Sequence, residues 1–177
     1  LKVVSLILLT AVVGMLLAVP APYLPDGWLV ISASIGIGMA SASAAVFNHI
    51  VDEQIDIQMS RTDQRPLPQG KVSRNQALVW GVFLGVVGLG TLQLFVNTIT
   101  MLLTFASLIG YAVVYTMYLK RATPQNIVIG GAAGAAPPVL GWTAISGTQG
   151  IEHAFLLFLI VFIWTPPHFW ALAIHRV

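Results

Sequence analysis

The chain has 177 residues, of which 57% are apolar and only 8% are charged, and its formal net charge is +2. Soluble domains carry about 25% charged residues, so this composition excludes an ordinary water-soluble globule, and the high apolar content excludes disorder. The sequence contains no cysteine, which excludes disulfide frameworks, thiolate metal sites and cysteine nucleophiles. We therefore interpret the chain as an integral membrane protein that contacts the lipid bilayer and no nucleic acid.

Six uncharged stretches of 17–20 residues follow one another along the chain. Each is long enough to cross about 30 Å of hydrocarbon as an α-helix. The sequence therefore predicts an all-α protein, a polytopic transmembrane helical bundle that forms a single domain over residues 1–177. The predicted spans are Val3–Val19, Trp28–Phe47, Ala77–Val96, Ile99–Tyr118, Ile127–Ile145 and Phe155–Ile174.

The distribution of basic residues predicts the orientation of these spans. The loops after the first, third and fifth spans hold no Lys or Arg, and all eight bases lie at the opposite ends. By the positive-inside rule, the charged loops face the cytoplasm in a bacterial inner membrane, or the matrix in a mitochondrial inner membrane. Because the chain opens on Leu1 and stops at Val177 directly after an apolar stretch, we expect a fragment that lacks both ends.

A row of polar residues follows the second span. Asn48, Asp52 and Asp56 are spaced i, i+4 and i+8, which places them on one face of a helix about 6 Å apart in rise. Carboxylate and amide oxygens suit Mg²⁺, which takes one or two carboxylates and completes its shell with water and substrate phosphates. The alternative is that these acids form the solvated end of a membrane helix.

The segment Arg61–Lys71 comes next, and its prolines and glycine predict a rigid turn. Ser73, with Gln76 three residues later, predicts a capping box at the start of the third span. Thr123 and Pro124 predict an N-cap and a proline at the first helical position for the fifth span, after the second basic loop. Acids and bases on one membrane face suit a metal–diphosphate site, and the alternative is that the bases serve only orientation and lipid headgroups.

Two proline pairs interrupt the later spans. Pro137–Pro138 and Pro166–Pro167 predict breaks or kinks in the fifth and sixth spans, where freed backbone groups must face protein or a cavity. Gly130 and Gly134, four residues apart, favour close helix packing, with space for a flat or elongated ligand as the alternative.

His168 is an ionisable residue inside the sixth predicted span, which makes it a candidate for binding a substrate or moving a proton. The alternative is a neutral histidine that bonds the carbonyls freed by the prolines. The neighbouring Trp164, Phe169 and Trp170 are either cavity walls or packing residues.

Several long strings carry a specific family resemblance. The row Asn48–Asp56, with Arg61–Thr62 and Arg65–Leu67, resembles the first aspartate-rich motif of the UbiA-type intramembrane prenyltransferases. Within that superfamily the sequence looks most like the haem-farnesylating branch. The strings that carry this are Tyr115–Thr116, Lys120–Ala135, Pro137–Pro138, Gly141–Trp142 and Trp164–Ile174.

The resemblance implies a bundle of about nine transmembrane helices, of which six lie in this chain. It implies Mg²⁺-dependent transfer of a farnesyl group from farnesyl diphosphate to a vinyl group of haem B, a substrate and not a cofactor, giving haem O for haem A synthesis. A partner protein of haem A synthesis is expected as well. The second aspartate-rich motif of the family is missing from this sequence, so we expect the fragment alone to be inactive.

The resemblance also implies roles for individual residues. Asn48, Asp52 and Asp56 would be catalytic, with the two aspartates and the asparagine at the metal. The expected substrate-binding residues are Arg61, Arg65, Tyr115, Lys120, Arg121 and His168.

Two other functions remain open from the sequence. The first is a prenyltransferase of the same superfamily with an aromatic, quinone-precursor acceptor. The second is a non-catalytic membrane transporter or scaffold, which broken helices and an intramembrane histidine would also fit.

Overall fold

A computed structural model describes residues 2–58, 62, 64–119 and 126–174 of the chain. Over these ranges the regular secondary structure is entirely helical, with seven α-helices, one π-helix and no strand, so the predicted all-α class is confirmed. The elements are α1 (Lys2–Leu17), α2 (Gly27–Gln58), α3 (Arg74–Phe95), α4 (Thr98–Ile109), η1 (Gly110–Leu119), α6 (Asn126–Ala135), α7 (Pro137–Ser146) and α8 (Ile151–Ile174).

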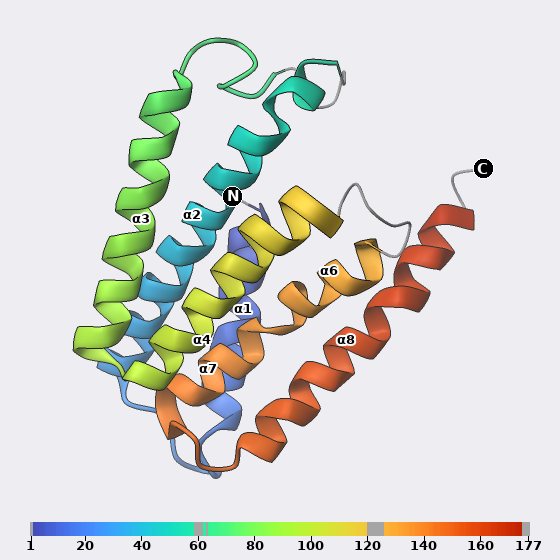
Figure 1. Cartoon of the computed structure of the whole chain (residues 1–177). Coiled ribbons are helices and arrows are strands. Elements are labelled where there is room, and N and C mark those ends of the chain that lie inside the picture. Colours follow the sequence, from blue (N-terminus) through green and yellow to red (C-terminus); the bar gives the residue numbers. More distant parts are fainter. Residues whose placement is uncertain (1, 59–61, 63, 120–125, 175–177) are drawn as a thin grey trace.

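The helices run up and down as a bundle (Figure 1). The long helices α2 and α3 pack against each other along their length, and α1 packs against α7. On the other side of the bundle α8 contacts α6 and α7. The loop between α2 and α3 lies at the end of the bundle opposite the short turn between α3 and α4, as Figure 1 shows. The row of Asn48, Asp52 and Asp56, called the acid row below, and the loop after it therefore lie at the same end of the molecule.

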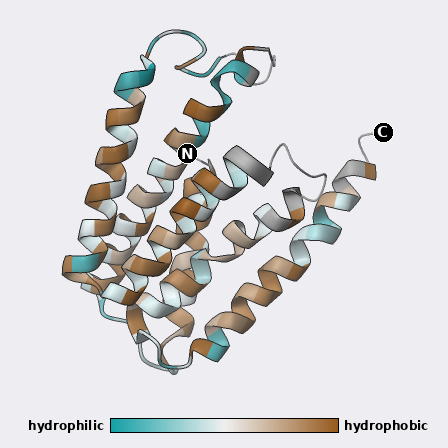
Figure 2. Cartoon of the chain, in the orientation of Figure 1, coloured by the Kyte–Doolittle hydropathy of each residue, from teal (hydrophilic) through white to brown (hydrophobic). Residues whose placement is uncertain are grey.

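Among the residues that the structure describes, three helices are long and apolar enough to cross a membrane by length and composition, at Gly27–Gln54, Arg74–Phe95 and Ile151–Ala171. Shorter apolar helices lie at Val3–Leu17 and Thr98–Val113. Their outward faces carry large apolar side chains. Figure 2 shows that hydrophobic residues predominate along α8 and recur along α3. A bilayer accommodates such a surface and water does not, so the protein is an integral membrane protein.

The two proline pairs behave differently. The fifth predicted span is broken, because α6 ends at Ala135 and α7 begins at Pro137, where a missing N–H costs nothing. The sixth span is not broken, because α8 runs through Pro166 and Pro167, so of the predicted break or kink the break is wrong. The hydroxyl of Thr165 donates to the Val161 carbonyl at 2.8 Å, which adds a hydrogen bond beside the two that the prolines remove.

The α6–α7 break is held against the rest of the bundle. Gly14 lies against the carbonyl of Pro138, and Gly141 lies against the carbonyl of Ala11, so the backbones of α1 and α7 meet where a Cβ would collide. The core of buried residues around this contact comprises Ala11, Met15, Ala33, Ile37, Leu92, Leu140 and Ala144.

A polar contact fixes α7 to α4. The Asn97 side chain accepts from the Thr100 amide at 2.9 Å and so caps α4, and its Nδ2 donates to the Thr143 carbonyl at 2.9 Å. The Thr100 hydroxyl donates to the Thr143 hydroxyl at 3.1 Å, and both side chains are fully buried. These bonds satisfy polar groups inside the bundle and set the position of α7 beside α4.

Candidate functional site

The acid row lies on the last turns of α2, which continues to Gln58, well beyond the apolar span. Asp52 and Asp56 are buried, with exposures of 3% and 4%. Acids at a merely solvated helix end would be exposed, so the burial favours the site interpretation over that alternative. A buried carboxylate requires a cation or hydrogen-bond donors beside it, and Arg65 supplies a cation beside Asp56.

Arg65 is the charged partner of Asp56. Its Nη1 lies 2.5 Å from Oδ2 of Asp56, and the side chains are 31% and 6% exposed, respectively. The Thr62 hydroxyl donates to the backbone carbonyl of Asp56 at 3.1 Å. The loop therefore folds back onto the end of α2 and places a guanidinium on the acid row.

The loop that carries Arg65 is anchored by one apolar side chain. Leu67 is buried in a small cluster with Ile50 of α2 and Ala77 of α3. The Gly70 amide donates to the Leu67 carbonyl at 2.9 Å, and Gly70 has φ +67°, a conformation that favours glycine. The predicted rigid turn is therefore present among the residues described.

The predicted capping box at the start of α3 is confirmed. The Ser73 hydroxyl accepts from the Gln76 amide at 3.3 Å, and the Gln76 side chain accepts from the Ser73 amide at 2.9 Å. Both ends of the loop are thus fixed, by α2 on one side and by this cap on the other.

The π-helix η1 packs beside the acid row and contacts it through Thr116. The Thr116 hydroxyl lies 3.2 Å from Oδ1 of Asn48 and 2.8 Å from the Tyr111 carbonyl, and its single proton can be donated to one of them at a time. Tyr115 stacks on Tyr111 with ring centroids 5.4 Å apart. π-helical turns are rare and occur often at functional sites, because they turn side chains out of ordinary register.

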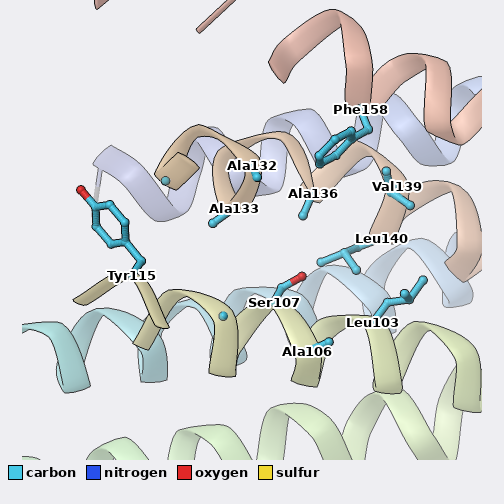
Figure 3. Close-up of a pocket in the computed structure, with 12 residues that line it drawn as sticks. Leu103, Ala106, Ser107, Tyr115, Ala132, Ala133, Ala136, Val139, Leu140 and Phe158 are labelled. Carbon is cyan, nitrogen blue, oxygen red and sulfur yellow. The ribbon is translucent and has the colours of Figure 1, made fainter. Parts of the chain in front are cut away.

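An apolar cavity of about 470 Å³ lies between α4, η1, α6, α7 and α8. Figure 3 shows Tyr115 at one end of it, with its hydroxyl directed away from the other labelled side chains. The cavity is lined by Leu103, Ala106, Ser107, Gly110, Tyr115, Gly130, Ala132, Ala133, Ala136, Val139, Leu140 and Phe158.

The glycines of α6 have different neighbours. Gly130 lies against the Tyr115 ring, where a Cβ would collide. Gly131 lies against Thr165 of α8, with 2.8 Å from an added Cβ to the threonine methyl carbon. Gly134 has open space instead, so the predicted Gly130–Gly134 packing pair is wrong: Gly130 packs against η1 and its neighbour Gly131 packs against α8.

His168 lies exposed on α8, stacked on Trp164 with ring centroids 4.3 Å apart. Trp164, Phe169 and Trp170 are 61%, 42% and 60% exposed and do not line the cavity described above. A role for His168 in binding a substrate stays a prediction. The basic residues Arg61, Lys120 and Arg121 lie outside the described residues.

The donor chemistry of the acid row fits part of a magnesium site. Two buried carboxylates and the amide of Asn48 present hard oxygen atoms at one end of the bundle. Within the part of the chain that the structure describes, no group of three or more His, Cys, Asp or Glu side chains could hold a metal ion. The row therefore has the donor atoms for one side of a metal site, and its role at a metal stays a prediction.

The structure adds three residues to those that the sequence singled out. Leu67 anchors the loop, Thr116 contacts Asn48, and Gly131 allows α6 to approach α8. A lone leucine between two prolines could have indicated a buried anchor in an otherwise polar loop. The other two depend on how helices are rotated against each other, which no local pattern reports.

Comparison with family models gives a match to the UbiA prenyltransferase family over residues 7–177. The chain belongs to the UbiA prenyltransferase family. This UbiA chain is 87% identical over 177 residues to the protoheme IX farnesyltransferase of Ruthia magnifica subsp. Calyptogena magnifica, covering 100% of the chain and 59% of that protein. It is 63% identical to protoheme IX farnesyltransferase 2 of Pseudoalteromonas atlantica, covering 99% of the chain and 56% of that protein. The chain thus spans about 60% of the length of these curated relatives.

Two solved structures share the UbiA fold with this chain. The apo UbiA homologue from Aeropyrum pernix K1 matches with a TM-score of 0.77 at 24% identity, covering 92% of this chain and 59% of that one. The UbiA homologue from Archaeoglobus fulgidus, solved with GPP and Mg²⁺ bound, matches with a TM-score of 0.71 at 18% identity, covering 93% and 59%.

Proposed function

We propose that the full-length protein is a Mg²⁺-dependent protohaem IX farnesyltransferase, which transfers a farnesyl group from farnesyl diphosphate to a vinyl group of haem B and so forms haem O. The observation that carries this is the position of η1, which borders both the acid row and the apolar cavity. Thr116 contacts Asn48 of the row, and the adjacent Tyr115 lines the cavity. A substrate with a charged head and an apolar tail would contact both.

The polar end would bind the diphosphate. Asp52, Asp56 and Asn48 would hold the metal, which as a Lewis acid neutralises the leaving diphosphate. Arg65, together with Arg61, Lys120 and Arg121, would bind diphosphate oxygens by charge-assisted hydrogen bonds. Tyr115 would orient the substrate where head and tail meet. The Archaeoglobus homologue was solved with GPP and Mg²⁺ bound, which supports an isoprenyl diphosphate and Mg²⁺ as the ligands proposed here.

The apolar end would shield the farnesyl group. Breaking its C–O bond releases diphosphate and leaves an allylic cation, which forms a C–C bond with the terminal vinyl carbon of haem B. Water then adds its oxygen to the inner vinyl carbon and loses a proton, which completes the hydroxyethylfarnesyl group. Apolar walls such as Leu103 and Phe158 would keep water from the cation before the C–C bond forms.

The choice of haem as acceptor rests on the relatives. Proteins that are 87% and 63% identical over this chain carry the name protoheme IX farnesyltransferase. That identity favours haem over the aromatic acceptor and over a transporter or scaffold. His168 would contact haem from α8, and a partner that converts haem O to haem A stays a prediction.

The basic loops support an orientation in which the acid row faces the cytoplasm of a bacterial inner membrane, or the matrix of a mitochondrion. All eight bases lie on that side in the sequence. Farnesyl diphosphate would therefore enter from the cytoplasmic or matrix side, with its tail passing inward.

The test uses the full-length protein in detergent with haem B, farnesyl diphosphate and Mg²⁺. The double variant D52N/D56N should lower haem O formation by about a hundredfold or more, because it removes both carboxylate charges from the metal. Glu152→Gln is the matched control, since this acid is exposed at the start of α8, and it should retain wild-type turnover. Undiminished turnover in D52N/D56N would remove the acid row from the site.

A further inference from the structure

The ion pair between Arg65 and Asp56 is unevenly buried. The Asp56 side chain is 6% exposed, whereas the Arg65 side chain is 31% exposed, and Nη1 of Arg65 lies 2.5 Å from Oδ2 of Asp56. A buried carboxylate is stable only with its charge balanced, and here the guanidinium balances it. The proposed function gives the same carboxylate to a metal ion. The Asp56 carboxylate would thus have two cationic partners, Arg65 and the metal ion, and these two positive charges would repel each other.

We propose that Arg65 exchanges partners during the binding cycle: it neutralises Asp56 in the metal-free protein and moves to the substrate diphosphate when Asp56 takes the metal. This inference rests on the proposed function and adds a second role for the same arginine. A planar guanidinium suits both partners, because it forms paired hydrogen bonds with carboxylates and with phosphates.

The loop geometry allows this exchange through the side chain alone. The Arg65 amide donates to the Thr62 carbonyl at 3.1 Å, and the Gln69 amide donates to the Arg65 carbonyl at 3.1 Å, so the backbone on both sides is fixed. Two residues later, Leu67 is buried against Ile50 and Ala77. The partly exposed Arg65 side chain can therefore swing to a diphosphate while its backbone stays in place.

The exchange couples the two ligands. Metal that binds alone must leave Arg65 without its carboxylate, whereas metal that binds with a diphosphate gives Arg65 a new anion. Metal and diphosphate should then each raise the affinity for the other. A purely structural clamp predicts the opposite effect of removing the arginine, because losing the clamp would loosen the acid row and weaken metal binding.

The experiment measures Mn²⁺ binding to the full-length protein in detergent, with free Mn²⁺ followed by electron paramagnetic resonance. Arg65→Gln should lower the Kd for Mn²⁺ alone by about fivefold or more, because no counter-cation has to leave Asp56. Arg74→Gln is the matched control, because Arg74 is exposed at the start of α3 and the variant removes the same charge near the same end of the bundle. Its Kd should stay within about twofold of wild type, since exposed charges are screened.

An Arg65→Gln protein that binds Mn²⁺ no more tightly than wild type would overturn the exchange and leave the proposed function standing. A wild-type protein that binds no Mn²⁺ even with inorganic pyrophosphate present would overturn the metal site itself, and the exchange with it.

A second measurement needs no variant. Phenylglyoxal modifies accessible arginines, and peptide mass spectrometry reports the extent at Arg65. In the wild-type protein, Mg²⁺ alone should raise modification of Arg65 by about threefold or more, and inorganic pyrophosphate added with Mg²⁺ should lower it again. Modification that is unchanged by Mg²⁺ would contradict the exchange.

Discussion

Replacing Leu67 with alanine should release the loop that carries Arg65 without unfolding the bundle. Leu67 is 9% exposed and packs with two other buried residues, Ile50 and Ala77, at the end of the bundle. Truncating a buried leucine costs about 2–5 kcal/mol, and the small size of this cluster favours the low end, about 2 kcal/mol. That cost raises the ratio of undocked to docked loop by about thirtyfold.

Limited trypsinolysis of the full-length protein measures this opening. In the docked loop the Lys71 amide donates to the Pro66 carbonyl at 2.9 Å, so cleavage after Lys71 requires the loop to open. When reclosing is fast, the cleavage rate follows the open population, and L67A should be cut there about thirtyfold faster than wild type. The control is Leu94→Ala, because Leu94 is 77% exposed on α3. Cleavage of L67A within about threefold of both wild type and L94A would refute the anchor.

Two glycine comparisons test the packing around the cavity. Gly130→Ala would push the Tyr115 ring away from α6 and should lower haem O formation by about tenfold. Gly134→Ala, in the same helix with open space around the new Cβ, should retain wild-type activity, and equal losses in the two variants would count against the Tyr115 contact. Gly141→Ala would force α7 away from the Ala11 carbonyl and should cost about 1–3 kcal/mol, seen as a lower thermal midpoint of the full-length protein in detergent. Gly90→Ala, which meets nothing within 4 Å, should leave the midpoint equal or higher, and a midpoint for G141A at or above that of G90A would disprove the close approach of α1 and α7.

The sequence was sufficient for those features that depend on local spacing. The i, i+4, i+8 row at Asn48, Asp52 and Asp56 could be read because a helix maps that spacing onto one face. The Ser73 cap and the break at Pro137 were predictable for the same reason, since each depends on a few neighbouring residues and on backbone groups that proline or serine changes directly.

The spacing of residues in the sequence could not predict the features that are set by contacts between helices. The choice of Gly131 instead of Gly134 as the packing glycine depends on the rotation of α6 against α8. The pairing of Arg65 with Asp56 depends on a loop whose path is set by Leu67. The prolines of α8 were expected to break or kink the helix, but a helix in a membrane has no water to replace its hydrogen bonds, so it continues past the lost ones.

The most direct test of the proposed function is an acceptor competition. Full-length protein, farnesyl diphosphate and Mg²⁺ are incubated with equal amounts of haem B and a phenolic acid of the quinone-precursor type, and products are identified by mass. The proposed function predicts haem B enlarged by one farnesyl group and one hydroxyl group, no prenylated phenol, and loss of the product when Mg²⁺ is chelated. A prenylated phenol with unmodified haem would contradict the proposed function.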